Sequence, residues 1–490
     1  MISQIKMKRF FVLTSALLFI VCTGHSQSTS KDPVGQTLQT GHPNILVIVT
    51  DQQSATMLSA AGNKWLHTPA LDRLASEGVR FEKAYATNPV CVPSRFSLQT
   101  GLFSSVIGMR ENDRPIATNS LPILESLHSR SLGNIFRNAG YETYYGGKVH
   151  LPTQIQNPVP WGYTLISKDE RNELAKTAAD FLLNRNAADK PFLLFVSFIN
   201  PHDICYDAIR FGWPDSPLAR QTPKVLLEAL KIPEGITKQD FFDKYCPPLP
   251  TNYQPMFGES YTVDSLIRLR SFREVVRDKW TDEDWRLHRW AYARLTEKAD
   301  SLIGVVMRAL DKSGVKNNTI IVFTSDHGDM DGAHKLEHKT VFYEESARIP
   351  FIISYPWMKK KGRVDSLHLV SNGLDLLPTL CDISGIKLSE ALPGKSLTPL
   401  LDTKPIQNWR KHIFIESELG YLIHTGRYKY ELDDKNGIKL REVFSDLQVD
   451  PGETCNMIND SKYAGTIRQL REELLAHLAE LKIKVSPLEK

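Results

Sequence analysis

The sequence predicts an α/β protein whose large sheet, mixed but mostly parallel, is sandwiched between helices. Three uninterrupted apolar runs are typical of strands buried on both faces of such a sheet. They cover residues 44–50, 191–198 and 319–325. The runs lead into polar residues at Asp51, His202 and Asp326. Because ligands bind beyond the carboxyl ends of strands in open α/β sheets, we expect one shared site there.

Further elements are expected between and after these strands. Helices are predicted at 68–78, 132–140, 174–185 and 285–310, and shorter strands at 79–84, 141–145 and 350–354. Residues 205–285 are rich in Pro, Trp and charge and have weak periodicity. We expect them to form a long excursion over the sheet edge, where substrate selectivity is often determined.

From about residue 405 the pattern changes to short strands separated by polar turns. Strands are predicted at 413–416, 421–424, 428–432 and 441–446, with Asn436-Gly437 as a hairpin signal and an amphipathic helix at 467–481. These predict a small C-terminal antiparallel sheet with a packed helix. We therefore expect four parts: a signal peptide (1–26), a flexible leader (27–42), a main α/β domain that holds the shared site (43–404) and a C-terminal α+β subdomain (405–490).

The N-terminus has the features of an export signal. Basic residues between positions 6 and 9 precede an apolar run at 10–21 that is too short to span a bilayer securely. Gly24-His25-Ser26 offers a small-x-small cleavage site. Cys22 offers the alternative of a lipid anchor, which Val21 before it disfavours. No second apolar run approaches membrane length, so we expect no transmembrane segment.

The composition is that of an ordinary globular protein. Of 490 residues, 41% are hydrophobic and 24% charged, and 60 basic against 56 acidic residues leave a net charge of +4. This small charge does not indicate nucleic-acid binding, so local Arg and Lys must provide any anion recognition. Besides Cys22 there are five cysteines, which do not amount to a disulfide scaffold. Whether Cys205, Cys246, Cys381 and Cys455 pair is left open.

One cysteine, Cys91, lies in a stretch better explained by chemistry than by packing, TNPVCVPSRFSLQTG at residues 87–101. Pro93 fixes a backbone dihedral, and Ser94 is predicted to cap a helix that ends at Gly101. A helix N-terminus suits an anionic ligand, and Arg95 in the first turn opposes the helix dipole unless something negative is bound. The alternative is a buried cysteine beside a surface arginine.

Polar residues after two of the predicted strands indicate a metal site. Asp51 and Gln52 follow the first strand, and Asp326 and His327 follow the strand at 319–325. Carboxylate and amide oxygens suit Ca²⁺, whereas His327 taken alone would favour zinc or manganese. The alternative is that each Asp caps a following helix.

The Cys91-x-Pro-Ser-Arg95 stretch, continued by Thr100-Gly101, resembles the signature of the type I sulfatases, in the alkaline phosphatase superfamily. Similar family segments are Gly147-Lys148-x-His150, Asn200-Pro201-His202, Lys339 before Tyr343-Glu344-Glu345, and a tail motif at 444–456. The resemblance covers nearly all of the mature chain. It implies an alkaline-phosphatase-like fold and an enzyme that hydrolyses a sulfate ester.

The resemblance also implies cofactors. A maturase would oxidise Cys91 to formylglycine (3-oxoalanine), an aldehyde whose hydrate attacks the sulfate ester. One divalent ion, usually calcium, would be held by Asp51, Gln52, Cys91, Asp326 and His327. Gln52 and His327 occupy the positions that vary in the family, so the metal site of this chain would have fewer negatively charged ligands.

A sulfate ester needs fixed cations and a proton donor aimed at the departing oxygen. The resemblance implies that Arg95 and Lys148 hold the hydrate and the sulfate, that His202 and Lys339 assist the leaving group, and that His150 helps to eject sulfate. For each of these residues alone, the alternative is a solvated lysine or a packed histidine. Candidate substrate contacts are His338, Asp113 and Arg114.

The family suggests a sulfated carbohydrate substrate, from a glycosaminoglycan, a mucin or an algal glycan, and the export signal suggests the bacterial periplasm. One alternative is a phosphonate or phosphate ester hydrolase of the same superfamily. Another is a non-catalytic glycan-binding relative, which the intact Cys91 and its cationic set disfavour because a binding module needs no nucleophile.

Overall fold

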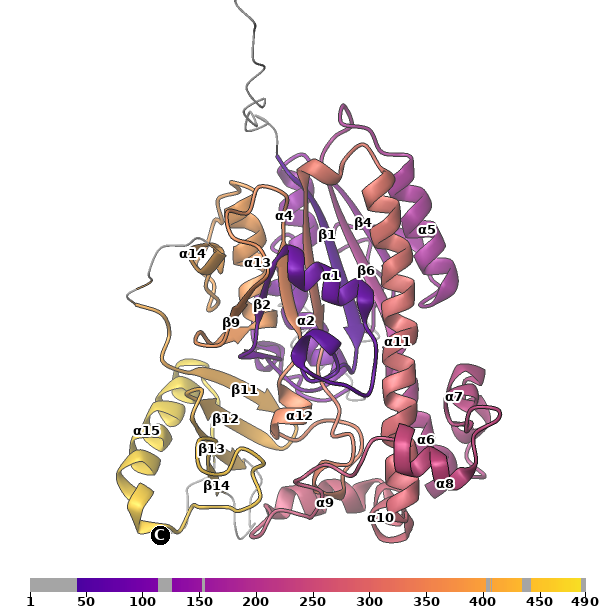
Figure 1. Ribbon diagram of the computed structural model, residues 1–490. Helices are drawn as coiled ribbons and strands as arrows, with labels where there is room; N and C mark the ends of the chain where they lie inside the picture. The colour runs from indigo at the N-terminus through magenta and orange to yellow at the C-terminus, as the bar shows by residue number, and fades with distance from the viewer. Residues whose placement is uncertain are drawn as a thin grey trace, which may run out of the picture. The chain divides into compact units, whose positions relative to one another are not determined.

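The computed structural model describes residues 42–112, 126–151, 155–401, 406, 408–433 and 442–485. Its main sheet has eight strands in the order β5-β4-β6-β1-β7-β8-β2-β9 (Figure 1). Of these eight, β8 alone runs opposite to the others. The bounds are β1 (Asn44–Asp51), β2 (Val79–Phe81), β4 (Glu142–Gly147), β5 (Thr164–Ser167), β6 (Phe192–Pro201), β7 (Thr319–Ser325), β8 (Phe351–Ser354) and β9 (Arg363–Asp365). A separate pair joins β3 (Ala84–Tyr85) and β10 (Val370–Ser371).

Helices cover both faces of this sheet. Alternate side chains of the central strand β1 point to opposite faces, and on each face they pack into a separate apolar cluster with helices. Leu46 and Ile48 pack with α1 (Pro69–Glu77), α5 (Asn172–Leu183) and the long α11 (Asp282–Lys312). Ile45 and Val47 pack with α2 (Cys91–Thr100), α4 (Leu132–Asn138) and α13 (Asn372–Ile383). The two helix layers are visible in Figure 1. The predicted fold class is confirmed.

The stretch between β6 and α11, for which the sequence predicted no regular elements, contains short helices around one end of α11 (Figure 1). They are α6 (Cys205–Gly212), α7 (Lys224–Ala229), α8 (Lys238–Asp240), α9 (Tyr261–Leu269) and α10 (Ser271–Lys279). Helices of nine residues or fewer show too few turns for a clear period, which explains the weak signal. Helix α10 packs against α6, with Phe272 against Trp213 at a ring separation of 4.8 Å.

The predicted C-terminal antiparallel sheet is confirmed, in the order β11 (Ile413–Ser417), β12 (Gly420–His424), β13 (Tyr428–Asp433) and β14 (Glu442–Asp446). Helix α15 (Ala464–Glu480) packs on it through Ile467, Leu470 and Leu474. The Asn436-Gly437 hairpin signal lies outside the described residues, as do the predicted signal peptide and nearly all of the leader.

None of the helices in the described residues combines the length and the apolar character that crossing a bilayer requires. The five cysteines that these residues contain are all free thiols.

Candidate active site

The site begins where β1 and β7 end side by side. These strands are parallel and in register, with Thr50 opposite Ser325, so Asp51 and Asp326 meet at one edge of the sheet. Both carboxylates are fully buried. Gln52 has a left-handed backbone (φ 70°), and its N–H donates to Asp326 Oδ1 at 3.0 Å. Strand order therefore brings together residues 275 positions apart in the sequence.

Helix α2 adds Cys91, but it begins earlier than predicted. The N-cap is Val90, and Cys91 is the first helical residue, so the predicted capping role of Ser94 is wrong. Pro93 is accommodated because the N–H groups of a first helical turn have no intrahelical partner. The Ser94 hydroxyl instead donates to the Asp326 backbone carbonyl at 2.6 Å. This bond ties the helix start to the end of β7.

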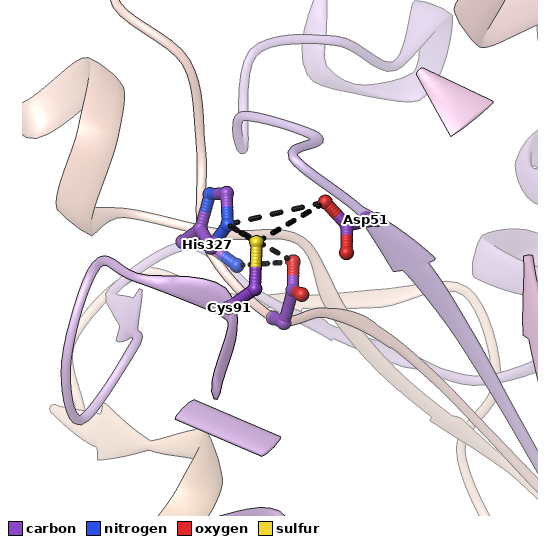
Figure 2. Close-up of side chains that lie close together, drawn as sticks. Asp51, Cys91 and His327 are labelled. Carbon is purple, nitrogen blue, oxygen red and sulfur yellow. Dashed lines mark hydrogen bonds and ion pairs between the residues drawn. The ribbon is translucent and has the colours of Figure 1, made fainter. Parts of the chain in front are cut away.

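Four potential ligand groups converge on one point. The ligand atoms of Asp51, Cys91, Asp326 and His327 all lie within 4.8 Å of one another, and all four residues are buried (Figure 2). Cys91 Sγ is 3.1 Å from His327 Nε2 and 3.7 Å from Asp51 Oδ1. His327 Nδ1 lies 2.8 Å from the Gly328 carbonyl, which can only accept, so Nδ1 carries the proton. In the neutral ring Nε2 is then a lone-pair donor facing the cluster.

This arrangement fits a divalent cation. Two buried carboxylates lie close together, and burial together with the Asp51 charge raises the pKa of Asp326 to about 6. A bound cation would relieve that repulsion. The donor set of two carboxylates and one imidazole accommodates several divalent ions, and conversion of Cys91 from sulfur to an oxygen group would shift it towards hard ions such as calcium.

The Arg95 guanidinium binds both carboxylates of the cluster, Asp51 and Asp326. It donates to Asp326 Oδ2 at 2.8 Å, to Asp51 Oδ2 at 2.9 Å, and to the Lys148 carbonyl and Ser197 Oγ at 2.8 and 2.7 Å. The Lys148 ammonium contacts Asp51 Oδ2 at 2.7 Å. Burial raises the pKa of Asp51, but the cations around it, Lys148 first and Arg95 with it, lower it well below its ordinary value. Asp51 is therefore an anion with fixed counterions.

Lys339 reaches the site from the loop before α12 (Glu344–Ala347). Its ammonium donates to Cys91 Sγ at 3.1 Å and to Gln52 Oε1 at 2.7 Å. Burial and Asp51 raise the pKa of the Cys91 thiol, but the charges of Lys339 and Lys148 outweigh these effects and lower it well below its usual range. The surroundings of residue 91 therefore stabilise a negative charge there.

Gln52, predicted as a metal ligand, has its side chain engaged elsewhere. Besides the Lys339 contact, Gln52 Oε1 accepts from the Cys205 thiol at 3.1 Å, and Nε2 donates to Asp329 Oδ2 at 2.6 Å. The structure therefore shows this amide orienting Lys339. Sequence reasoning assigned no role to Cys205 or Asp329. Their closeness in sequence to His202 and His327 was the one available signal.

The other predicted histidines differ in how the structure connects them to the site. Burial and the charges of Lys148 and Lys339 lower the pKa of His202 well below its usual value, so its imidazole is neutral. His338 is buried next to Lys339, with its ring 5.5 Å from that of Phe272. His150 is half-buried with a left-handed backbone, and its Nδ1 has no hydrogen-bond partner among the described residues. No contact joins it to the cluster within the described part of the chain.

Asp113 and Arg114 lie outside the described residues. The structure therefore does not place these two candidate substrate contacts.

Comparisons with known proteins agree with this geometry. The sulfatase family profile matches residues 43–386, and that of the C-terminal region of N-sulphoglucosamine sulphohydrolase matches residues 332–480. A Delta 4,5-hexuronate-2-O-sulfatase of Bacteroides thetaiotaomicron is 28% identical over 88% of this chain and 87% of its own. An ulvan-active sulfatase of Formosa agariphila is 28% identical over 90% and 81%.

Solved structures show the same fold. The phosphonate monoester hydrolase of Agrobacterium radiobacter superposes with a TM-score of 0.68 at 22% identity, covering 90% of this chain and 96% of that one. At that identity the likeness concerns the fold alone. The family profile spans most of the chain and includes Cys91 and its buried partners. The chain therefore belongs to the sulfatase family and is a sulfuric ester hydrolase.

Proposed function

We propose that this protein hydrolyses a sulfate ester on a carbohydrate, using a formylglycine made from Cys91 and one bound calcium ion. The observation that carries the proposal is the convergence of Cys91 with Asp51, Asp326 and His327 beneath Lys339. The carbohydrate part is supported by the relatives described above, one of which acts on a hexuronate and the other on ulvan.

The formylglycine would supply an oxygen nucleophile, and calcium, held by Asp51, Asp326 and His327, would neutralise charge on the sulfate oxygens. The protein's own cations are already in place for an anion. Arg95 is locked by both carboxylates, and the Lys148 and Lys339 ammonium groups act on position 91 from nearby. Such fixed charges stabilise the negative charge that develops in the transition state without reorganising.

Lys339 is the group best placed to donate a proton to the departing oxygen. Its ammonium touches Cys91 Sγ and is oriented by Gln52. His202 is neutral because of burial and the charges of Lys148 and Lys339. An anion that enters the site would raise the pKa of His202, which could then share or relay that proton. We assign ejection of sulfate to His150, whose Nδ1 has no hydrogen-bond partner within the described ranges.

We also propose that residues 1–26 direct export to the bacterial periplasm, with a lipid anchor at Cys22 as the second choice, and that a maturase oxidises Cys91 before export. Mass spectrometry of the peptide that contains Cys91 tests the maturation. A mature N-terminus at Gln27, found in the periplasmic fraction, would support the export route.

The decisive assay is sulfate release from defined sulfated monosaccharides and disaccharides by matured enzyme. Cys91→Ala should abolish release while ligand binding remains, and unchanged release would refute the role of Cys91. Binding without release by the matured wild type would instead favour a non-catalytic relative. A parallel measurement with an aryl sulfate and the matching aryl phosphonate tests the phosphonate alternative. Higher kcat/KM for the phosphonate would overturn our choice of reaction.

A further inference from the structure

Arg273, in the first turn of α10, is a buried cation that the fold pairs only weakly. Its exposed fraction is 7%. Its one ion pair among the described residues is to Glu337, with Nε 3.6 Å from Oε1, and this Nε has no hydrogen-bond partner there. Burial of a guanidinium is costly unless the group is paired and hydrogen-bonded. Burial and the charge of Arg270 accordingly lower the pKa of Arg273 to about 10.

Two connections place Arg273 beside the active site. Helix α10 packs against α6, and α6 begins at Cys205, whose thiol donates to Gln52. Glu337, the contact of Arg273, lies two residues before Lys339, which touches Cys91. The start of α10 therefore borders the site on the side of Lys339.

The surrounding carboxylates leave the positive charge partly uncompensated. Glu337 also lies against the His338 ring, and its 3.6 Å separation from Arg273 is longer than a hydrogen bond. Glu418, between β11 and β12, acts electrostatically on Arg273, but no ion pair joins the two within the described part of the chain. Lys339, the residue after His338, adds a further positive charge that acts on the same ring as Arg273 does. This corner of the site is therefore suited to an anion.

We propose that Arg273 binds a second anionic group of the substrate, a carboxylate or a further sulfate next to the sulfate ester that is cleaved. The inference rests on the proposed carbohydrate sulfatase function and narrows its substrate to sugars that carry at least two negative groups. A guanidinium presents parallel N–H donors that match the oxygens of either anion, so it discriminates by geometry as well as charge.

The test uses matured enzyme and three sugars sulfated at the position that the wild type cleaves. One carries no other anion, one has a carboxylate, and one has a second sulfate. We expect the wild-type kcat/KM to be about tenfold or more higher for at least one anionic sugar than for the neutral one. The anionic sugar that is preferred identifies the group. Arg273→Gln should bring this ratio close to one, and Arg273→Lys should leave an intermediate ratio.

The matched control is Arg277→Gln, one turn further along α10, because Arg277 pairs with Glu259 at 2.9 Å. This control should keep the wild-type ratio. A ratio near one in the wild type overturns the inference even if the Arg273 variants fail to fold. An equal loss on all three sugars in Arg273→Gln overturns it too, since that pattern indicates a structural role. If none of the three sugars releases sulfate, the proposed function itself has failed.

Discussion

The substitution Arg95→Met tests whether the Arg95 guanidinium holds the two site carboxylates together. Arg95 is 3% exposed and makes ion pairs of 2.9 Å to Asp51 and 2.8 Å to Asp326. Lys148 would still neutralise Asp51 at 2.7 Å, so the main loss falls on Asp326. Removing one partner of a buried ion pair costs about 3–5 kcal/mol of unfolding free energy. Methionine fills a similar volume, so the expected loss is electrostatic.

The pH dependence follows from the same residues. The folded-state pKa of Asp326, already about 6, should rise further without Arg95, above its unfolded value of 3.8. The folded variant then binds more protons than the unfolded chain, so its stability falls as pH rises through this range. The deficit relative to wild type should therefore be larger at pH 8 than at pH 6. Added Ca²⁺ should reduce it, because a cation replaces the missing charge.

Denaturant unfolding in EDTA, with and without subsequent Ca²⁺, measures these differences. The matched control is Arg268→Met on α9, which removes an ion pair to Asp264 at 3.0 Å whose arginine side chain is 69% exposed. We expect no measurable loss there. A loss for Arg95→Met that equals the control, or one that does not change with pH, would refute the reasoning.

Three further predictions follow from the described contacts. Lys339→Ala should lower kcat by about 10²–10⁴-fold with little change in KM, because the proposed proton donor is lost; a purely KM effect in steady-state kinetics would contradict that role. Removal of divalent ions with EDTA should abolish sulfate release, and Ca²⁺ should restore it; restoration by zinc alone would overturn the choice of metal. His334 is fully buried and stacks on Tyr343 at 4.0 Å, and burial lowers its pKa to about 4 against 6.5 unfolded. Between those values the unfolded chain binds more protons, so stability should fall by up to about 3 kcal/mol from pH 6.5 to pH 4. His334→Gln should flatten that part of the curve in denaturant titrations, and an unchanged slope would contradict the assignment.

Much of the fold could be predicted because its signals are local. The apolar runs at 44–50, 191–198 and 319–325 all became central strands of the sheet, and their lack of polar alternation reflects burial on both faces. The helices between 205 and 280 could not be predicted, since short helices around the end of α11 carry too few turns for a period to emerge.

By itself the sequence determined the fold class, the cysteine motif and most of the residues that gather around it. These features could be predicted because strand ends and a short motif are encoded by residues that are neighbours in the sequence. Only the tertiary structure decided that Ser94 bonds to Asp326 rather than capping a helix, and that Gln52 is engaged by Lys339, Cys205 and Asp329. The tertiary structure alone placed Arg273 against Glu337, two residues before Lys339. Those contacts depend on where a helix starts and on the packing of segments far apart in the chain, which no local pattern encodes.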